Sequence, residues 1–118
     1  MAGVINTYSL YRNATTESLL IDAVDADGNL RDSSLGGGQY PIAGTYDAAT
    51  STLTFHGGGL DGRGDGNLFV SHYTGCPILD GDGNTTALAG TYTEFVIRLN
   101  PFGYASELGG WYAIPDLG

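Results

Sequence analysis

The sequence contains no lysine and only four arginines, and it has a single cysteine, Cys76. Thirteen acidic residues give a formal net charge of −9, and the arginines are scattered, so the clustered cations that neutralise nucleic-acid phosphates are lacking. One cysteine cannot form an internal disulfide, and no apolar run approaches the roughly 18 residues that cross a bilayer. These absences argue against a nucleic-acid-binding protein, a disulfide scaffold and a membrane span.

The beginning of the chain also lacks a targeting signal. Met1-Ala2-Gly3-Val4 has neither the basic region nor the apolar region of a secretory signal peptide. We therefore expect synthesis in the cytoplasm, and a virion or an extracellular particle stays open as the final location.

The composition is that of a folded, β-rich domain. Hydrophobic residues make up 42% of the chain and charged residues 14%, and a length of 118 residues fits one domain, 1–118. Twenty glycines, four prolines and repeated Asp-Gly pairs separate short runs rich in β-branched and aromatic residues. The sequence predicts a mainly β fold, a small antiparallel β-barrel or β-sandwich of roughly 7–9 short strands.

Alternating side chains locate the strands. In 51–56, Leu53 and Phe55 share one face and are expected in the core, and 41–47 is expected to form the hairpin partner. Residues 67–74 carry bulky side chains on both faces, which predicts a strand buried on both sides. Further strands are expected at 4–11 and 110–115.

The longest β-type run, 85–99, is too long for a flat strand, and Gly90 is the expected site of a bulge or bend. Glu94 and Arg98 share a face that is expected to meet water. The opposite, apolar face is expected to meet the core: Phe95, Ile97 and Leu99. The following Asn100-Pro101-Phe102-Gly103 matches a type I turn.

Residues 16–27 fit two structures. They could form one short helix, with Thr16 at its cap and an apolar stripe ahead of Gly28. Alternatively, a strand over 18–24 pairs with 29–33 across Asp25-Ala26-Asp27-Gly28, because Asp-Gly is a strong hairpin signal. The sequence leaves both open.

Two acidic turns suggest calcium, and no other cofactor is expected. Each places three oxygen-bearing side chains at alternate positions, as the first half of an EF-hand loop does, but neither has the glycine at position six nor the glutamate at position twelve. Hairpin turns account for the same residues. The candidate calcium ligands are Asp25, Asp27, Asn29, Asp80, Asp82 and Asn84.

Other motifs are weak. Arg63-Gly64-Asp65 spells an integrin-recognition tripeptide in a glycine-rich stretch, but tripeptides recur by chance. His56 and His72 are the only side chains that titrate near neutrality without a special environment, and Cys76 follows His72 closely. No spacing among them defines a catalytic or zinc site, so no catalytic residue is assigned.

Aromatic residues supply the candidate binding surface. Eight tyrosines and one tryptophan combine flat apolar area with a polar edge, as interfaces and sugar-binding sites do. Tyrosine is also a favoured strand residue that simply packs. The candidate ligand-binding residues are Tyr46, Tyr73, Tyr92, Trp111 and Tyr112.

The strand count and the two Gly-Thr-Tyr strands, at 44–46 and 90–92, resemble small up-and-down barrels of the lipocalin and avidin kind. Neither family's aromatic and ligand-contact pattern can be laid over these residues. The resemblance therefore implies an architecture and no function.

The lack of lysine, the few reactive groups, the many turns and the absence of a cofactor motif favour an interaction protein over an enzyme. We expect a structural β-domain that packs into a larger assembly with protein partners, copies of itself included, such as a capsid-decorating or other virion component. A barrel that binds a small ligand or a glycan is the first alternative, and a small barrel enzyme is the second.

Overall fold

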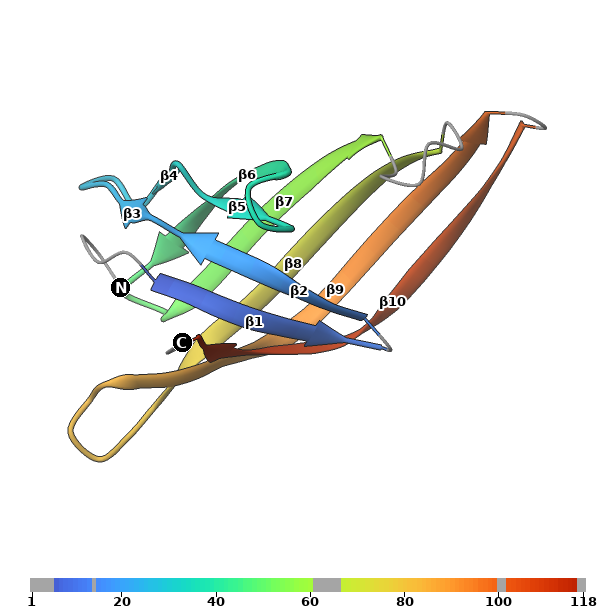
Figure 1. Ribbon diagram of the computed structural model, residues 1–118. Helices are drawn as coiled ribbons and strands as arrows, with labels where there is room; N and C mark the ends of the chain where they lie inside the picture. Colours follow the sequence, from blue (N-terminus) through green and yellow to red (C-terminus); the bar gives the residue numbers. More distant parts are fainter. Residues whose placement is uncertain (1–5, 14, 61–66, 100–101, 117–118) are drawn as a thin grey trace.

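The computed structural model describes residues 6–13, 15–60, 67–99 and 102–116, and ten strands account for most of them (Figure 1). The strands are β1 (Asn6–Arg12), β2 (Thr15–Ile21), β3 (Ala23–Val24), β4 (Leu30–Arg31), β5 (Ser34–Leu35), β6 (Tyr40–Asp47), β7 (Thr52–Leu60), β8 (Leu68–Leu79), β9 (Thr85–Leu99) and β10 (Phe102–Pro115).

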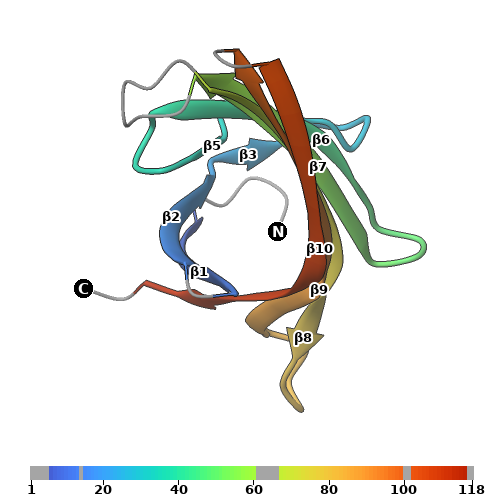
Figure 2. The same ribbon diagram turned by 90° about the vertical axis from the view of Figure 1, so that its right-hand side faces the viewer.

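Eight of the strands close into an antiparallel barrel in the order β1-β10-β9-β8-β7-β6-β5-β2, with β1 paired to both β10 and β2 (Figure 2). Each barrel strand thus lies beside its neighbours in the chain, which is an up-and-down meander. β3 and β4 form a separate small hairpin between β2 and β5. The expected antiparallel β fold is confirmed, and it is a barrel.

The barrel core follows the period-two pattern of its strands. Leu53 and Phe55 are fully buried, as expected, and 40–47 is the hairpin partner of their strand. Phe55 stacks on Tyr73 at a ring-centroid distance of 4.7 Å, and Trp111 meets both rings edge-on at 5.8 Å. The Trp111 indole N–H donates to the carbonyl oxygens of Thr74 and Thr91, at 3.2 and 3.0 Å. An aromatic layer therefore fills the middle of the barrel.

The helix considered for residues 16–27 is wrong. The segment contains β2, which pairs with β1 over its whole length, and then β3. Leu19 and Ile21, two apart, are both fully buried inside the barrel, whereas Leu20 between them is only half-buried. The backbone N–H and C=O groups of β2 form hydrogen bonds with β1, the preceding strand. In a helix, the same groups would have bonded within the segment itself.

The Asp-Gly hairpin signal is confirmed over a shorter span than expected. Ala23 and Val24 pair with Arg31 and Leu30. Gly28 supplies the turn's left-handed backbone, with φ of 86°. Its amide donates to the Asp25 carbonyl oxygen at 3.0 Å.

Two strands bury faces that differ from the expectation: β9 is turned over, and β8 is buried on one side instead of two. On β9 the half-buried Glu94 faces the interior between Tyr92 and Val96, while Phe95 is 41% exposed. On β8 the side chains of Leu68 and Val70 are exposed, so this strand is buried on one side only. The cause is that the barrel interior is polar at one end and part of its outer face is apolar. Alternation then fixes the two faces but not which of them is inside.

No bulge occurs at Gly90; the shift in register between β8 and β9 lies instead at Ile78 and Leu79. Gly90 is needed for a close approach of strands. A Cβ atom there would lie 1.9 Å from the Thr74 carbonyl oxygen and 2.5 Å from the Gly75 Cα. Contacts this short force the backbone of one strand to move.

Parts of the sequence-based expectations lie outside the described residues: the Arg63-Gly64-Asp65 motif, the start of the turn at Asn100 and Pro101, and the beginning of the chain. Within the described ranges there is no helix of the length and hydrophobicity that a membrane crossing requires.

The close approach at Gly90 gives a direct test of barrel packing. Gly90→Ala should lower the free energy of unfolding by roughly 3 kcal/mol, because the methyl group overpacks the β8–β9 interface. Gly81→Ala is the matched control, since nothing lies within 4 Å of a Cβ at that position. Urea denaturation followed by circular dichroism measures both. Equal stability of the two variants would contradict the packing explanation.

Candidate functional site

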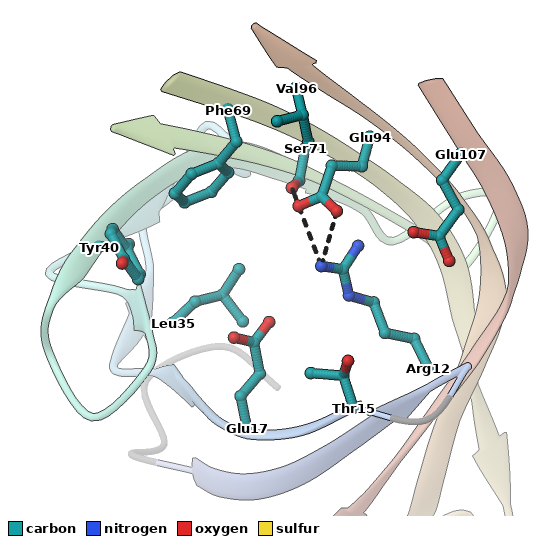
Figure 3. A pocket seen from close by; sticks show the side chains of 10 residues that line it. All are labelled: Arg12, Thr15, Glu17, Leu35, Tyr40, Phe69, Ser71, Glu94, Val96 and Glu107. Carbon is teal, nitrogen blue, oxygen red and sulfur yellow. Dashed lines mark hydrogen bonds and ion pairs between the residues drawn. The ribbon is translucent and has the colours of Figure 1, made fainter. Parts of the chain in front are cut away.

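A cavity of about 350 Å³ lies inside the barrel, at the end where β1 is followed by β2 and where β9 ends and β10 begins (Figure 3). One part of its lining is charged or polar: Arg12, Thr15, Glu17, Ser71, Glu94 and Glu107. The other part is apolar or aromatic: Leu35, Tyr40, Phe69 and Val96. We call this end of the barrel the cavity end.

The strands themselves carry these polar groups inside. On β1, Arg12 continues the inward series of Tyr8 and Leu10, and on β2 Glu17 precedes the buried Leu19 at the same spacing. Across β8, β9 and β10 the register aligns Ser71 with Glu94 and Glu94 with Glu107. On β1 and β2 the inner face therefore changes from apolar to polar towards the cavity end, whereas on β8 and β9 the polar Ser71 and Glu94 are followed by the apolar Phe69 and Val96.

An ion pair forms the floor of the cavity. One terminal nitrogen of Arg12, Nη2, donates to both carboxylate oxygens of Glu94 at 2.9 and 3.0 Å, and Ser71 Oγ donates to Glu94 Oε1 at 2.9 Å. The side chains of Arg12 and Glu94 are only 12% and 14% exposed. Burial, the largest single effect, would lower the pKa of Arg12, but the hydrogen bond to Glu94 and the charge interactions with Tyr73, Glu94 and Glu17 together outweigh it, so the pKa is raised and the guanidinium stays charged.

Glu107 is satisfied by a separate set of donors. The Tyr92 hydroxyl donates to Glu107 Oε1 at 2.5 Å and Asn13 Nδ2 donates to the same oxygen at 2.8 Å. These hydrogen bonds, that of Tyr92 first, lower the pKa of Glu107, which keeps it ionised at neutral pH. The two carboxylates that face each other across β9 and β10 are thus held by different partners.

The third carboxylate, Glu17, lies across the cavity from this network (Figure 3). Among the described residues it forms no ion pair; burial, the largest effect, raises its pKa, while the charge of Arg12 and a hydrogen bond with the Tyr73 side chain oppose that rise. Two nitrogens of Arg12, Nε and Nη1, are buried without a hydrogen-bond partner in the described part of the chain. The cavity end therefore holds unused donors and a carboxylate without an ion pair.

The apolar part of the lining is built around two aromatic rings. Tyr40 and Phe69 meet edge to face, with their ring centroids 4.9 Å apart. Leu35 completes this part beside Glu17, and Val96 lies on the side of Glu94 (Figure 3). A molecule in the cavity would contact flat apolar surface on one side and charged groups on the other.

The aromatic residues proposed from the sequence are divided between several places. Tyr73, Tyr92 and Trp111 come together in the interior; the Arg12 guanidinium lies over the first two rings, 4.8 Å from the Tyr92 centroid and 5.9 Å from that of Tyr73. Tyr112 lies on the outer face, stacked on Tyr11. Tyr46 packs at the edge of the core, away from the cavity end. As binding residues, all five remain predictions.

The two histidines are neighbours on the outside of the barrel. His56 and His72 are partners across β7 and β8, with exposed side chains and ring centroids 6.4 Å apart. Cys76 is exposed further along β8. Among the described residues, no three His, Cys, Asp or Glu side chains lie close enough together to hold a metal ion.

The first aspartate of each acidic turn binds its own backbone. Asp25 Oδ1 accepts hydrogen bonds from the amides of Asp27 and Asn29, both at 2.9 Å, and Asp80 Oδ1 accepts equivalent bonds from Asp82 and Asn84. These bonds lower the pKa of both aspartates, the bond from the Asn29 or Asn84 amide contributing most. Turn formation explains the spacing of these residues, and calcium binding remains a prediction.

Sequence reasoning misses most of the cavity lining. It predicts that Glu94 faces water, and it assigns no role to Arg12, Glu17 or Glu107. One signal could have located them: charged residues continue the buried alternation of their strands, as Arg12 does after Tyr8 and Leu10. Recognising it requires knowing which face is inside, and that depends on long-range pairing.

The closed eight-stranded meander places the chain among small up-and-down β-barrels. A solved structure with this architecture is that of rhizavidin in complex with biotin, which superposes with a TM-score of 0.65 over 100% of this chain and 97% of the rhizavidin chain. The sequences are 15% identical, so the likeness shows the fold alone. No protein-family model matches the chain, and no curated protein sequence does either.

The ion pair at the floor of the cavity can be tested by mutation. Glu94→Gln should lower the free energy of unfolding by about 2 kcal/mol, because it leaves the Arg12 charge buried without its partner. The double variant Arg12→Met, Glu94→Leu should be as stable as the parent to within about 1 kcal/mol, since apolar packing replaces the pair. Chemical denaturation of the single and double variants measures both effects.

The control is Arg31→Gln, which removes the exposed ion pair of Arg31 with Asp25 and should leave stability almost unchanged. A Glu94→Gln protein as stable as the control would show that the buried pair does not hold the cavity floor.

Proposed function

We propose that this barrel binds a small organic molecule in the cavity at the cavity end. The volume of about 350 Å³ falls in the range of small-molecule sites, roughly 300–1,000 Å³, and the mixed aromatic and charged lining is the kind that such sites use. Rhizavidin, which has the same fold, is crystallised as a complex with biotin. This function corresponds to the ligand-binding alternative considered from the sequence.

The observation that carries the proposal is the set of unused polar groups around Arg12. Buried polar groups are nearly always hydrogen-bonded in folded proteins, and each exception calls for an explanation. Arg12 Nε and Arg12 Nη1 are two such exceptions, within the described residues, on a side chain that lines the cavity. An interior built for stability alone would be apolar here, because a buried ion pair adds little over apolar side chains of the same volume. A bound molecule supplies the missing partners.

The test is ligand screening against a variant with a filled cavity. Melting temperature and calorimetric titration, with biotin and a panel of small polar compounds as probes, should identify at least one compound that stabilises the protein. Val96→Trp places an indole in the cavity and should abolish that binding. Thr93→Trp adds the same side chain to the exposed outer face of β9 and should leave it unchanged.

Two results would contradict this function. Either no compound of the panel binds, or the compounds that bind do so equally well to Val96→Trp and to Thr93→Trp. The second result would place the binding site outside the cavity.

Self-association is a second candidate, and an apolar patch on the outer face of the barrel favours it. Val70 and Phe95 are partners across β8 and β9, and Tyr104 stacks on Phe95 at 5.2 Å. These three side chains are 56%, 41% and 69% exposed, and Leu108 nearby on β10 is 79% exposed. Exposed apolar patches of neighbouring residues mark interaction sites. This patch suits a second copy of the barrel; a role as a virion component remains a narrower prediction.

Sedimentation velocity tests the self-association. The protein should sediment as a species larger than the monomer, and Phe95→Glu should shift it to the monomer by placing a charge in the apolar contact. Thr16→Glu adds the same charge to the exposed face of β2 and should leave the larger species intact. A parent protein that stays monomeric at high concentration would overturn this candidate.

A further inference from the structure

The cavity contains one cation and three carboxylates, and these groups differ in how they are satisfied. Arg12 and Glu94 neutralise each other, with Ser71 as an additional donor. Glu107 accepts from Tyr92 and Asn13. Glu17 has no ion pair within the described residues. The charge left over in the cavity is therefore negative; it lies at Glu107, which accepts two hydrogen bonds, and at Glu17, which faces the cavity from the other side.

The position of Glu17 makes this negative charge costly. The side chain is half-buried and projects into the cavity, and the apolar Leu35 lies beside it (Figure 3). Burial raises its pKa, as expected for an acid whose charge is poorly compensated. A neutral ligand would remove water from this carboxylate and supply at most hydrogen-bond donors, and an anion would be repelled by Glu17 and Glu107. A positively charged group supplies both the donors and the opposite charge.

The surroundings of Glu17 also suit the rest of such a ligand. The aromatic pair of Tyr40 and Phe69 provides π faces and apolar area, and aromatic faces attract cations as well as apolar groups. On the other side of the cavity, the unused Nε–H and Nη1–H of Arg12 require an acceptor atom. The apolar contact and the acceptor atom are separate requirements, and each comes from a different part of the lining.

We propose that the ligand of this cavity is a small organic monocation, with an ammonium group that pairs with Glu17, an apolar body that packs on Tyr40 and Phe69, and an acceptor atom that faces Arg12. This inference rests on the proposed function and adds the chemical class of the ligand. A preference for a monocation distinguishes this cavity from a site that selects a molecule bearing a carboxylate.

The experiment compares three probes of nearly the same shape and different charge: tyramine, para-ethylphenol and para-hydroxyphenylpropionate, which are cationic, neutral and anionic at pH 7. Calorimetric titration should give the tightest binding for tyramine. The neutral probe should bind at least about tenfold more weakly, since a buried carboxylate left without its partner carries a penalty of this order or larger. The anionic probe should not bind measurably.

Glu17→Gln keeps the shape of the side chain and removes its charge. It should weaken tyramine binding by about tenfold or more, while para-ethylphenol should bind at least as tightly as before, since no charge at position 17 is left to desolvate. Asp82→Asn removes the same charge from an exposed turn and should change neither affinity, which controls for the net charge of the protein.

The outcomes separate the ligand class from the binding function. If the three probes bind equally, or if Glu17→Gln does not affect tyramine, the monocation class is wrong; loss of all binding in Val96→Trp would then still support the cavity as a site. If none of the probes binds the parent protein, the monocation class is also wrong, and the wider compound panel decides whether the cavity binds any ligand. The comparison of probes on the parent protein does not depend on how well the Glu17 variant folds.

Discussion

The ion pair of Arg12 with Glu94 organises one half of the barrel interior. It joins β1 to β9 across the intervening β10, and its two residues are 82 positions apart in the chain. Because Glu94 takes Nη2 of Arg12 and the hydroxyl of Ser71, the other nitrogens of Arg12 are left without partners. Because Arg12 lies over the rings of Tyr92 and Tyr73, the same pair separates the polar half of the interior from the aromatic half.

The two halves of the interior have different physical roles. The aromatic half, around Phe55, Tyr73 and Trp111, is closely packed and depends on glycines that let neighbouring strands approach. The polar half is incompletely packed and incompletely hydrogen-bonded. Its buried charges add little to the free energy of unfolding, because the cost of removing them from water offsets their attraction. Departures of this kind from a well-satisfied core are expected where a protein meets a ligand, and they are less expected in a purely structural domain.

Local signals predicted much of the fold. The hairpin of β6 and β7, the Asp-Gly turn at Gly28 and the long strand β9 follow from alternation and turn chemistry, which act over a few residues, whereas the final strand, expected over 110–115, begins at Phe102. The assignment of faces failed where the usual polarity is inverted, with a charged residue inside and an apolar one outside, as at Glu94 and Phe95. The cavity could not be predicted for the same reason, since its groups meet through pairings between distant strands. Residues 16–27 show the same limit: Leu19 and Leu20 suit a helix or a strand, and only the pairing with β1 decides.

Trp111 lies in the layer directly beneath the ion pair. It is the only tryptophan in the chain, it is 3% exposed, and it is the cross-strand partner of Arg12. Its indole meets the ring of Tyr73, over which the guanidinium of Arg12 lies. The emission of this single fluorophore therefore originates one ring away from the charged floor of the cavity. The protein carries an intrinsic optical reporter of that floor, so rearrangements there can be followed in solution without any added label.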